Sequence, residues 1–246
     1  MSAIPLLEFD PDRSLIEAEL EQLLAGSDRG PVRGAMQYAV FGAAAQRIRP
    51  LLALRVARLL GAPVRDAALP AAAVELFHCA SLIVDDLPCM DNAATRRGQP
   101  ATHIEFGEAP ALLAAFSLVA LAARSVIQFP KFQKRLLGVL DCNSLIAGQA
   151  LDLTDLKTVP LFELAIQAGG AASPRFADHE HTLMRFAREF GLAFQMVDDC
   201  LDGDQHDHST ALAQLDSART VATLLGDRAH ELLEITDYLQ YRLARP

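Results

Sequence analysis

The chain has 246 residues, of which 51% are hydrophobic and 22% are charged. This composition supports a sizeable core and excludes a chain that is disordered throughout. Asp+Glu 31 against Lys+Arg 22 gives a formal net charge of −9, which argues against a surface built to bind nucleic acid. Only three of the basic residues are lysines, so arginine, which favours planar bidentate contacts with carboxylate or phosphate, supplies most of the positive charge.

The sequence shows no pattern of export or membrane insertion. The first residues, MSAIPLLEFD, have neither a basic stretch nor a long apolar run, so we expect no signal peptide. The longest apolar stretch, 109–123, is too short to span a bilayer and contains Pro110, so we expect a buried helix and not an integral membrane protein. The four cysteines form no CxxC pair, which indicates reduced thiols in a cytoplasmic protein.

Helical patterns follow one another along the whole chain, and alternating β-branched runs are absent. We therefore expect an all-α fold, organised as a single domain over 1–246. In 178–203 the apolar residues, including Phe186 and Phe190, recur every three or four positions and form one stripe. The segment 91–108 is the longest stretch without a helical pattern, and long ordered loops often have a function. The predicted helices are 13–26, 31–45, 50–60, 66–86, 109–128, 131–149, 159–170, 178–203 and 210–243, the last broken near Gly226.

Two acidic clusters each follow an apolar helix. They are Asp85, Asp86 and Asp91, and Asp198, Asp199 and Asp202. Gln195 lies three residues before Asp198 and seven before Asp202, so these three share one helix face beside the phenylalanine stripe. Magnesium prefers one or two carboxylates together with substrate phosphates and water. The clusters therefore predict a Mg²⁺ site; the alternative is two solvated helix ends.

Two arginine pairs flank the first acidic cluster in the sequence, one close behind it and one far upstream. Arg96 and Arg97 follow it, and Arg47 and Arg49 precede it in the tetrapeptide RIRP. Guanidinium groups near metal-neutralised carboxylates are typical of anion binding. The alternative for Arg96 and Arg97 is a surface loop with salt bridges, and the alternative for Arg47 and Arg49 is a solvated turn before a helix. Together with the acidic clusters, the arginines predict two anionic groups, one held by metal ions and one by arginines.

From about residue 33 to residue 224 the chain resembles the trans-prenyltransferases of the polyprenyl synthetase family. DDLPCMDNAATRRGQPATH (85–103) is similar to the first aspartate-rich motif of the family, in a form that most resembles geranylgeranyl diphosphate synthases. FQMVDDCLDGD (194–204) is similar to the second aspartate-rich motif. Three further family signatures have counterparts in RIRP (47–50), GQALDL (148–153) and Lys157-Thr158.

The resemblance implies an isoprenoid synthase type of helical bundle around a central cavity, working as a homodimer. It implies head-to-tail condensation of an allylic diphosphate with isopentenyl diphosphate. The matching positions that would hold Mg²⁺ are Asp85, Asp86, Asp91, Asp198, Asp199 and Asp202. The allylic diphosphate or the developing cation would contact Arg96, Lys157 and Gln195, with Thr158 alongside. The isopentenyl diphosphate would be held by Arg49, His78 and Arg97.

Two small residues, Ala80 and Ser81, lie about one turn before Asp85. In the family that the chain resembles, bulky residues at this place shorten the product. Small residues here therefore predict a product of C20 or longer where the other cavity walls permit it, and the C20 geranylgeranyl diphosphate is the product that we expect.

The chain departs from the family pattern at several positively charged positions. Gln46 stands where the family usually has a lysine, and the segment 202–220, which usually supplies two more, has none. Each lost hydrogen bond to a charged group costs about 1.5–3 kcal/mol. These losses leave two alternatives open. The first interpretation stays a short-chain trans-prenyl diphosphate synthase; the alternatives are a catalytically weak modulating subunit in a heteromer with another prenyl synthase, and an enzyme similar to class I terpene cyclases.

Overall fold

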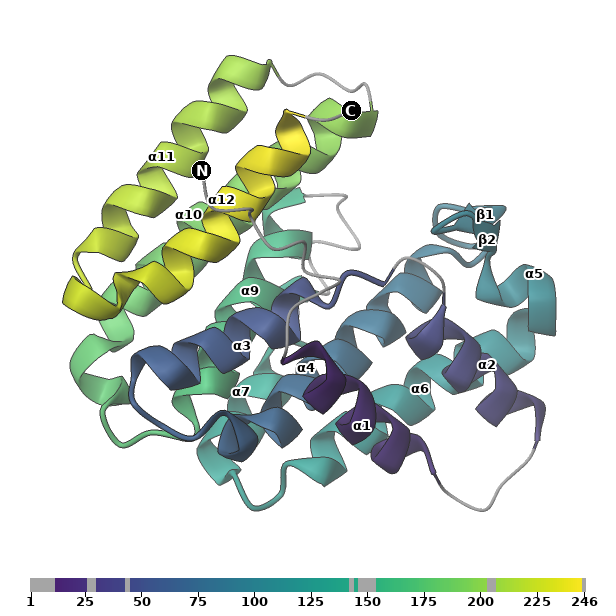
Figure 1. Ribbon diagram of the computed structural model, residues 1–246. Helices are drawn as coiled ribbons and strands as arrows, with labels where there is room; N and C mark the ends of the chain where they lie inside the picture. Colours follow the sequence, from purple (N-terminus) through teal and green to yellow (C-terminus); the bar gives the residue numbers. More distant parts are fainter. Residues whose placement is uncertain are drawn as a thin grey trace.

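The computed structural model describes residues 12–25, 30–42, 45–141, 144–145, 154–202 and 207–244 (Figure 1). The structure is 78% helical, and the all-α prediction is confirmed. The first helices in the chain are α1 (Arg13–Leu24), α2 (Pro31–Phe41), α3 (Ile48–Leu59) and α4 (Val64–Asp85). A short hairpin of β1 (Thr95–Arg96) and β2 (Gln99–Pro100) follows, and then α5 (Thr102–Phe106), α6 (Glu108–Ser125) and α7 (Pro130–Gly138). The last elements are α9 (Thr154–Gly170), α10 (Phe176–Asp202), α11 (His208–Thr223), the 3₁₀ turn η2 (Gly226–Ala229) and α12 (His230–Leu243).

Most predicted helices agree with the structure within a few residues. The break near Gly226 is confirmed, because this residue has φ 75° in the turn between α11 and α12, a conformation that suits glycine. The predicted start of a helix at residue 159 was wrong by five residues, since α9 begins at Thr154 and contains Pro160. The predicted helix 131–149 is confirmed only over α7, and part of its remainder lies outside the described residues.

The segment 91–108 is more ordered than the sequence pattern predicts. Its β-hairpin turns through Arg97 and Gly98, which have φ values of 54° and 75°. Positive φ at both central residues is the signature of the tight hairpin turn that matches strand twist. A helix of five residues, α5, follows and ends at Gly107, where φ is 88°. The expectation of a segment without helix was therefore wrong, because a single helical turn is too short to produce a periodic pattern.

Helix α4 lies at the centre of the larger group of helices and packs against α3, α6 and α9 (Figure 1). Its buried face is rich in alanine, which lets neighbouring helices approach closely. Helices α3 and α9 also approach closely, because a Cβ added at Gly169 would lie 2.2 Å from the carbonyl oxygen of Ala53. This close packing brings the carboxyl end of α4 and the amino-terminal part of α9 to the same region of the fold.

Helices α10, α11 and α12 form a second group that rises on one side of the molecule (Figure 1). The predicted phenylalanine stripe of α10 is confirmed: Phe186, Phe190 and Phe194 are buried or nearly so. Phe190 and Phe194 both contact Phe162 of α9, with ring centroids 5.2 Å apart in each pair. Aromatic contacts of this kind fix α10 against α9 and so place the second acidic cluster opposite the first.

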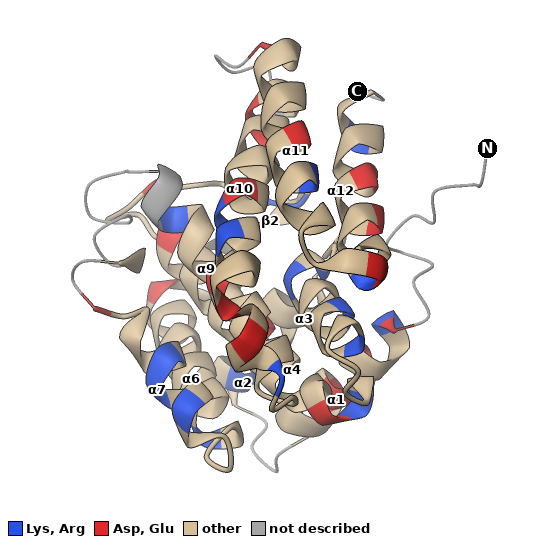
Figure 2. Ribbon diagram, turned by 90° about the vertical axis from the view of Figure 1, so that its left-hand side faces the viewer, with Lys and Arg blue, Asp and Glu red and all other residues tan. Residues whose placement is uncertain are grey.

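Two helices, α4 and α6, are long and apolar enough to cross a membrane by length and composition alone. The apolar window of α4 is 78% buried inside the fold, whereas that of α6 is 28% buried. The expectation of a short buried helix over 109–123 was therefore wrong, because α6 extends over 18 residues and exposes Leu112, Leu113 and Phe116. Helix α7 carries a basic group of Lys131, Lys134 and Arg135, visible as blue segments (Figure 2). The single-domain organisation over 1–246 stays a prediction.

Candidate active site

A cavity of about 520 Å³ lies between the carboxyl ends of α4 and α10, with α3 and α9 in its walls. It brings together most of the predicted site residues. Those that line it are Arg49, His78, Ser81, Asp85, Asp91, Arg96, Arg97, Lys157, Thr158, Gln195 and Asp198. A larger cavity of about 950 Å³ lies between α7 and the α9–α10 connection, but no predicted site residue lines it. Chemistry, and not size, therefore identifies the smaller cavity as the candidate site.

The two acidic clusters face this cavity from different helices. Asp85 ends α4, and a turn stabilised by a hydrogen bond from the Asp91 N–H to the Asp85 carbonyl, 2.9 Å, brings Asp91 beside it. Asp198 approaches from α10. Within the described residues no three His, Cys, Asp or Glu side chains form a group that holds a metal on its own. This arrangement fits Mg²⁺, which uses one or two carboxylates and completes its octahedron with substrate phosphates and water.

Asp86, which is adjacent to Asp85, points elsewhere. Its side chain is buried, it does not line the cavity, and both carboxylate oxygens accept hydrogen bonds from Arg96 Nε, at 3.0 and 3.2 Å. Arg96 Nη2 donates a further hydrogen bond to Asp86. The hydrogen bonds to this carboxylate raise the pKa of Arg96. Asp86 therefore orients an arginine of the cavity wall, and its direct contact with metal stays a prediction.

Arg49 and His78 form the basic part of the cavity wall. Nη1 of Arg49 lies 3.2 Å from Nε2 of His78, and its guanidinium lies 4.7 Å from the ring centre of Phe162. Burial lowers the pKa of Arg49 to about 10. Burial and the nearby arginines, above all Arg49, lower the pKa of His78 well below its ordinary value. Since arginine can only donate, the neutral His78 accepts at Nε2 and carries its proton on Nδ1.

Arg47, in contrast, is held by the protein itself. Its Nη1 donates to the Glu75 carboxylate at 2.8 Å, and both side chains are almost completely buried. Glu17 on α1 accepts two further hydrogen bonds from Arg47, each 3.0 Å long. Burial alone lowers the pKa of Arg47, but the two carboxylates outweigh it and the net pKa is raised. The guanidinium of Arg47 thus ties α1, α3 and α4 together, and Arg49 is the arginine of RIRP with donors for a ligand.

Helices α9 and α10 meet through a chain of hydrogen bonds at the opposite wall. The Thr158 hydroxyl donates to Gln195 Oε1 at 2.7 Å, and Gln195 Nε2 donates to Asp199 Oδ1 at 2.7 Å. Asp199 does not line the cavity and instead orients Gln195. Lys157 lines the cavity beside Thr158. The metal-ligand role predicted for Asp199 stays a prediction.

The remaining predicted residues are the two proposed to control chain length, Ala80 and Ser81, together with Asp202 and the signature 148–153. Ala80 is buried inside α4, and Ser81 lines the cavity while its hydroxyl donates to the His78 carbonyl at 2.8 Å. The side chain of Asp202 and the signature 148–153 lie outside the described residues. The predicted face of Gln195, Asp198 and Asp202 is therefore confirmed in the cavity for its first two members only.

The sequence reasoning missed two charged residues. Glu75, the buried partner of Arg47, lies on the apolar face of α4, where a carboxylate indicates a buried ion pair. Arg242, near the end of α12, lies 2.9 Å from the Asp198 carboxylate. No motif or spacing indicates this contact, because it depends on how α12 packs across the fold.

Comparisons with known proteins identify the family. The family model described as "Polyprenyl synthetase" matches residues 31–225. The chain belongs to the polyprenyl synthetase family. The resemblance inferred from the motifs is thereby confirmed.

Relatives and solved structures agree with this assignment. A geranylgeranyl diphosphate synthase of Pantoea ananas is 35% identical over 241 residues, covering 88% of this chain and 80% of the relative. A "heterodimeric geranylgeranyl pyrophosphate synthase large subunit 2" of Arabidopsis thaliana is 35% identical over 225 residues, or 79% of this chain. The chain spans 59% of that relative and 52% of a second Arabidopsis relative, geranylgeranyl pyrophosphate synthase 4. The crystal structure of a geranyltransferase from Legionella pneumophila matches with TM-score 0.84 and 29% identity, over 94% of both chains.

Proposed function

We propose that the protein is a short-chain trans-prenyl diphosphate synthase that joins an allylic diphosphate to isopentenyl diphosphate. One observation carries this proposal: Asp85, Asp91 and Asp198, from two separate motifs, face the same cavity as Arg49 and Arg97. The cavity therefore has a carboxylate side suited to metal and a guanidinium side suited to a second anion. The names of the relatives from Pantoea and Arabidopsis support the same activity.

In the proposed reaction the allylic C–O bond breaks, and diphosphate leaves with the bonding electrons. The double bond of isopentenyl diphosphate then attacks the allylic cation, a C–C bond forms, and a proton leaves the resulting carbocation for the released diphosphate. Magnesium held by the aspartates supplies Lewis-acid stabilisation of the leaving group. Arg96 and Lys157 add charge-assisted contacts to the same diphosphate, and Gln195 presents its amide dipole to the cation.

The residues of the basic wall bind the second substrate. Arg49 donates to the diphosphate of isopentenyl diphosphate, and Arg97, at the hairpin turn, donates from another side. His78 stays neutral and holds Arg49 by accepting its hydrogen bond. Leu161 and Phe194 add apolar surface, which keeps water away from the cation until the alkene reacts.

The test is direct. Purified protein is incubated with Mg²⁺, isopentenyl diphosphate and C5, C10 or C15 allylic diphosphate, and products are identified by mass spectrometry. We expect an elongated diphosphate, and its loss by at least 100-fold in Asp85→Asn and in Asp198→Asn, because each removes a proposed metal ligand. Asp216→Asn, at an exposed aspartate of α11, is the matched control and should keep full activity. Unchanged activity in both site variants would refute the assignment.

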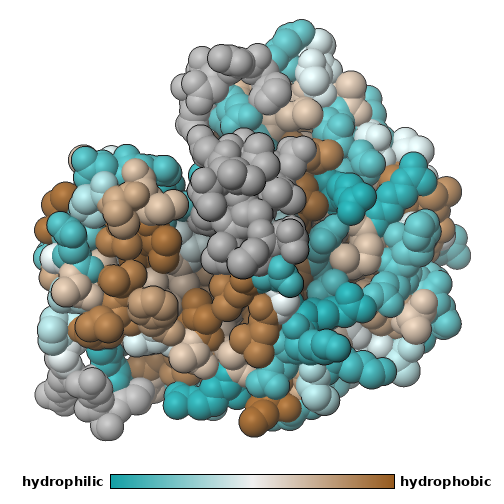
Figure 3. Space-filling view, turned by 180° about the vertical axis from the view of Figure 1, so that it is seen from behind, coloured by the Kyte–Doolittle hydropathy of each residue, from teal (hydrophilic) through white to brown (hydrophobic). Residues whose placement is uncertain are grey.

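The product and the assembly belong to the same proposal. Small residues at Ala80 and Ser81 support a C20 product. We propose a cytoplasmic homodimer, with α6 at the interface, because this helix exposes Leu112, Leu113 and Phe116 and the molecule shows a large apolar patch from behind (Figure 3). Light scattering should give twice the chain mass, and Phe116→Asp should shift it toward the monomer.

A second function, a modulating subunit in a heteromer with another prenyl synthase, is favoured by Gln46 at the cavity wall in place of the family lysine. The name of the heterodimeric Arabidopsis relative supports it. A third, a cyclase-like enzyme, would release diphosphate without isopentenyl diphosphate. Folded protein that binds Mg²⁺ and diphosphate but elongates nothing would favour the second function, and diphosphate release from the allylic substrate alone would favour the third.

A further inference from the structure

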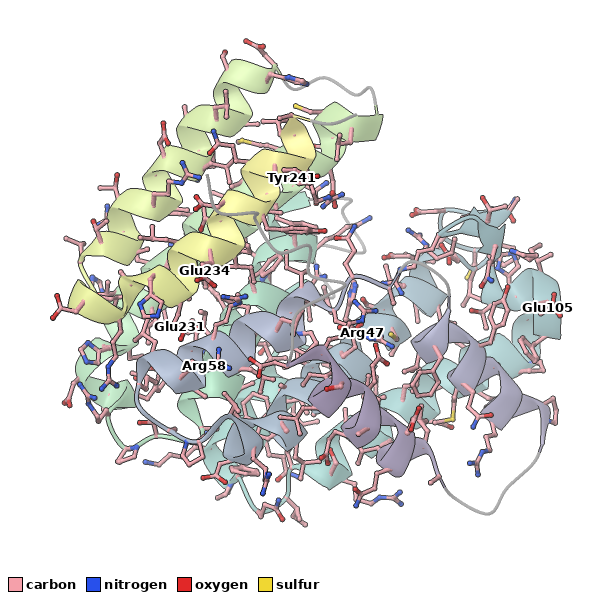
Figure 4. All side chains as sticks on the ribbon, in the orientation of Figure 1. Arg47, Arg58, Glu105, Glu231, Glu234 and Tyr241 are labelled. Atoms are coloured by element: carbon pink, nitrogen blue, oxygen red, sulfur yellow. The ribbon has the colours of Figure 1, made fainter. Side chains whose placement is uncertain are left out.

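The carboxyl end of α12 lies against the second acidic cluster. Nη2 of Arg242, in the last turn of α12, lies 2.9 Å from Oδ1 of Asp198, and the two side chains are 18% and 32% exposed. Tyr241, the preceding residue, marks this end of the helix in Figure 4. The other end of α12 is fixed on α3, where Glu231 and Glu234 pair with Arg58 and Arg55 at 3.1 and 2.7 Å (Figure 4). The ion pair with Asp198 thus joins a firmly docked helix to the candidate metal site.

The guanidinium of Arg242 has unused binding capacity. Its Nη1 is buried and, within the described part of the chain, has no hydrogen-bond partner. The group also lies 5.8 Å from the ring centre of Phe194, which Arg49 approaches to 5.7 Å. An arginine presents five donors in a planar fork that fits two oxygens of a phosphate at once. Arg242 therefore has donors left for a second anion beside the same aromatic ring as Arg49.

The absence of lysine from the segment 202–220 suggests a role for Arg242. The segment 202–220 contains no lysine, and the arginine within it, Arg219, is engaged elsewhere: its Nη2 donates to Asp237 and to Gln240 of α12. Arg242 contacts the second acidic cluster through its ion pair with Asp198. Positive charge that the sequence lacks before α11 is thus supplied from α12.

We propose that Arg242 is a diphosphate-binding residue that Asp198 holds in the absence of metal, and that it changes partner when Mg²⁺ arrives. The inference rests on the proposed function. Mg²⁺ held by Asp198 would draw negative charge from its carboxylate and so would weaken the ion pair with Arg242. The guanidinium of Arg242 would then be available for a charge-assisted bidentate contact with a diphosphate.

This exchange predicts two effects of opposite sign in one variant. Removing the charge in Arg242→Gln removes a competitor for Asp198, so Mg²⁺ alone should bind about 2- to 5-fold more tightly, the value of a partly exposed ion pair. The same variant loses a charged contact to phosphate, so inorganic pyrophosphate in saturating Mg²⁺ should bind about 10- to 100-fold more weakly. A residue with a purely structural role would shift both affinities in the same direction or neither.

The experiment is calorimetric titration of the full chain with Mg²⁺ alone and with inorganic pyrophosphate in saturating Mg²⁺. Arg242→Lys, which keeps the charge, should stay within about 5-fold of the wild type in both titrations. Arg219→Gln is the matched control, because it removes an arginine that contacts α12 away from the site, and both affinities should stay unchanged. Circular dichroism confirms that each variant is folded.

The outcomes separate this inference from the proposed function. Wild-type protein that binds no pyrophosphate with Mg²⁺ would overturn the proposed function and this inference with it. Wild-type protein that binds pyrophosphate as tightly as Arg242→Gln does would overturn the partner exchange alone. Equal weakening in Arg219→Gln would also overturn it, because the effect would then come from the docking of α12.

Discussion

Arg47 and Arg49 are two residues apart and nearly equally buried, yet their replacement should have opposite effects on stability. Arg47 pairs with the buried carboxylate of Glu75 at 2.8 Å. Arg47→Met leaves that carboxylate without its cation in the interior, and breaking a buried pair in this way costs about 3–5 kcal/mol. For a chain of this size each kcal/mol lowers Tm by about 2–4 °C, so we expect a fall of about 6–20 °C.

Within the part of the chain that the structure describes, Arg49 forms no ion pair of this kind. Burial lowers its pKa to about 10 from an ordinary value of 12.5, so at about 1.4 kcal/mol for each pKa unit the charge costs the folded state about 3 kcal/mol. Arg49→Met removes this cost but also the contact with Phe162, about 2 kcal/mol for a desolvated cation–π pair. The variant should therefore equal or exceed the wild type in stability, by about 1 kcal/mol, while its affinity for isopentenyl diphosphate falls.

Urea and thermal unfolding of both variants at pH 7.5, without ligand, measure the difference. Arg49 is charged in the folded and unfolded states at every pH below about 10, so its effect should be constant between pH 6 and 9. Calorimetric titration with isopentenyl diphosphate provides the functional comparison. Equal destabilisation by Arg47→Met and Arg49→Met would refute the division into a structural and a binding arginine.

Three other predictions concern neighbouring positions of α4 and its carboxyl end. Because burial lowers the pKa of His78, the unfolded chain binds a proton below pH 6.5 that the folded chain does not. The free energy of unfolding should therefore fall by up to about 1.4 kcal/mol for each pH unit below 6.5. In urea unfolding, His78→Gln should make this pH dependence weaker. At pH 8 the exposed Cys89 should react with a maleimide, whereas Cys79 should not, because burial raises the pKa of its thiol to about 12. Peptide mapping by mass spectrometry measures the labelling. Labelling of Cys79 in folded protein would contradict its burial. Ala80→Phe should shorten the product from C20 to C15, and an unchanged product would locate the length control elsewhere.

The sequence was sufficient for the architecture because the information was local and repeated. The phenylalanine stripe of α10 recurs over several turns, so small errors at its ends do not change the face that it buries. The two acidic motifs end or follow apolar helices, and this placement already indicated that they converge. The hairpin before α5 was missed because its turn needs positive φ at both Arg97 and Gly98. Only glycine adopts positive φ readily, so the sequence indicated this conformation at one of the two positions.

The direction of individual side chains was beyond the sequence. Asp85 and Asp86 are chemically identical neighbours, but successive residues at a helix end point about 100° apart, so Asp85 faces the cavity and Asp86 faces Arg96. The contact between Arg242 and Asp198 could not be predicted for a different reason. It depends on how α12 packs on α3 and α10. Neither spacing nor residue type encodes a contact of that kind.

The two adjacent aspartate pairs, Asp85-Asp86 and Asp198-Asp199, nevertheless divide their roles in the same way. A polar group that must meet a ligand is held in the right direction by another group beside it. Asp86 orients Arg96 by accepting its hydrogen bonds, and Asp199 orients Gln195 by accepting a hydrogen bond from the Gln195 amide. Each adjacent aspartate pair thus divides into a residue that faces the ligand and one that aims a neighbour. A substitution of the second kind should therefore reorient the site without removing a ligand, which distinguishes Asp86→Asn from Asp85→Asn even though the two side chains start from adjacent positions.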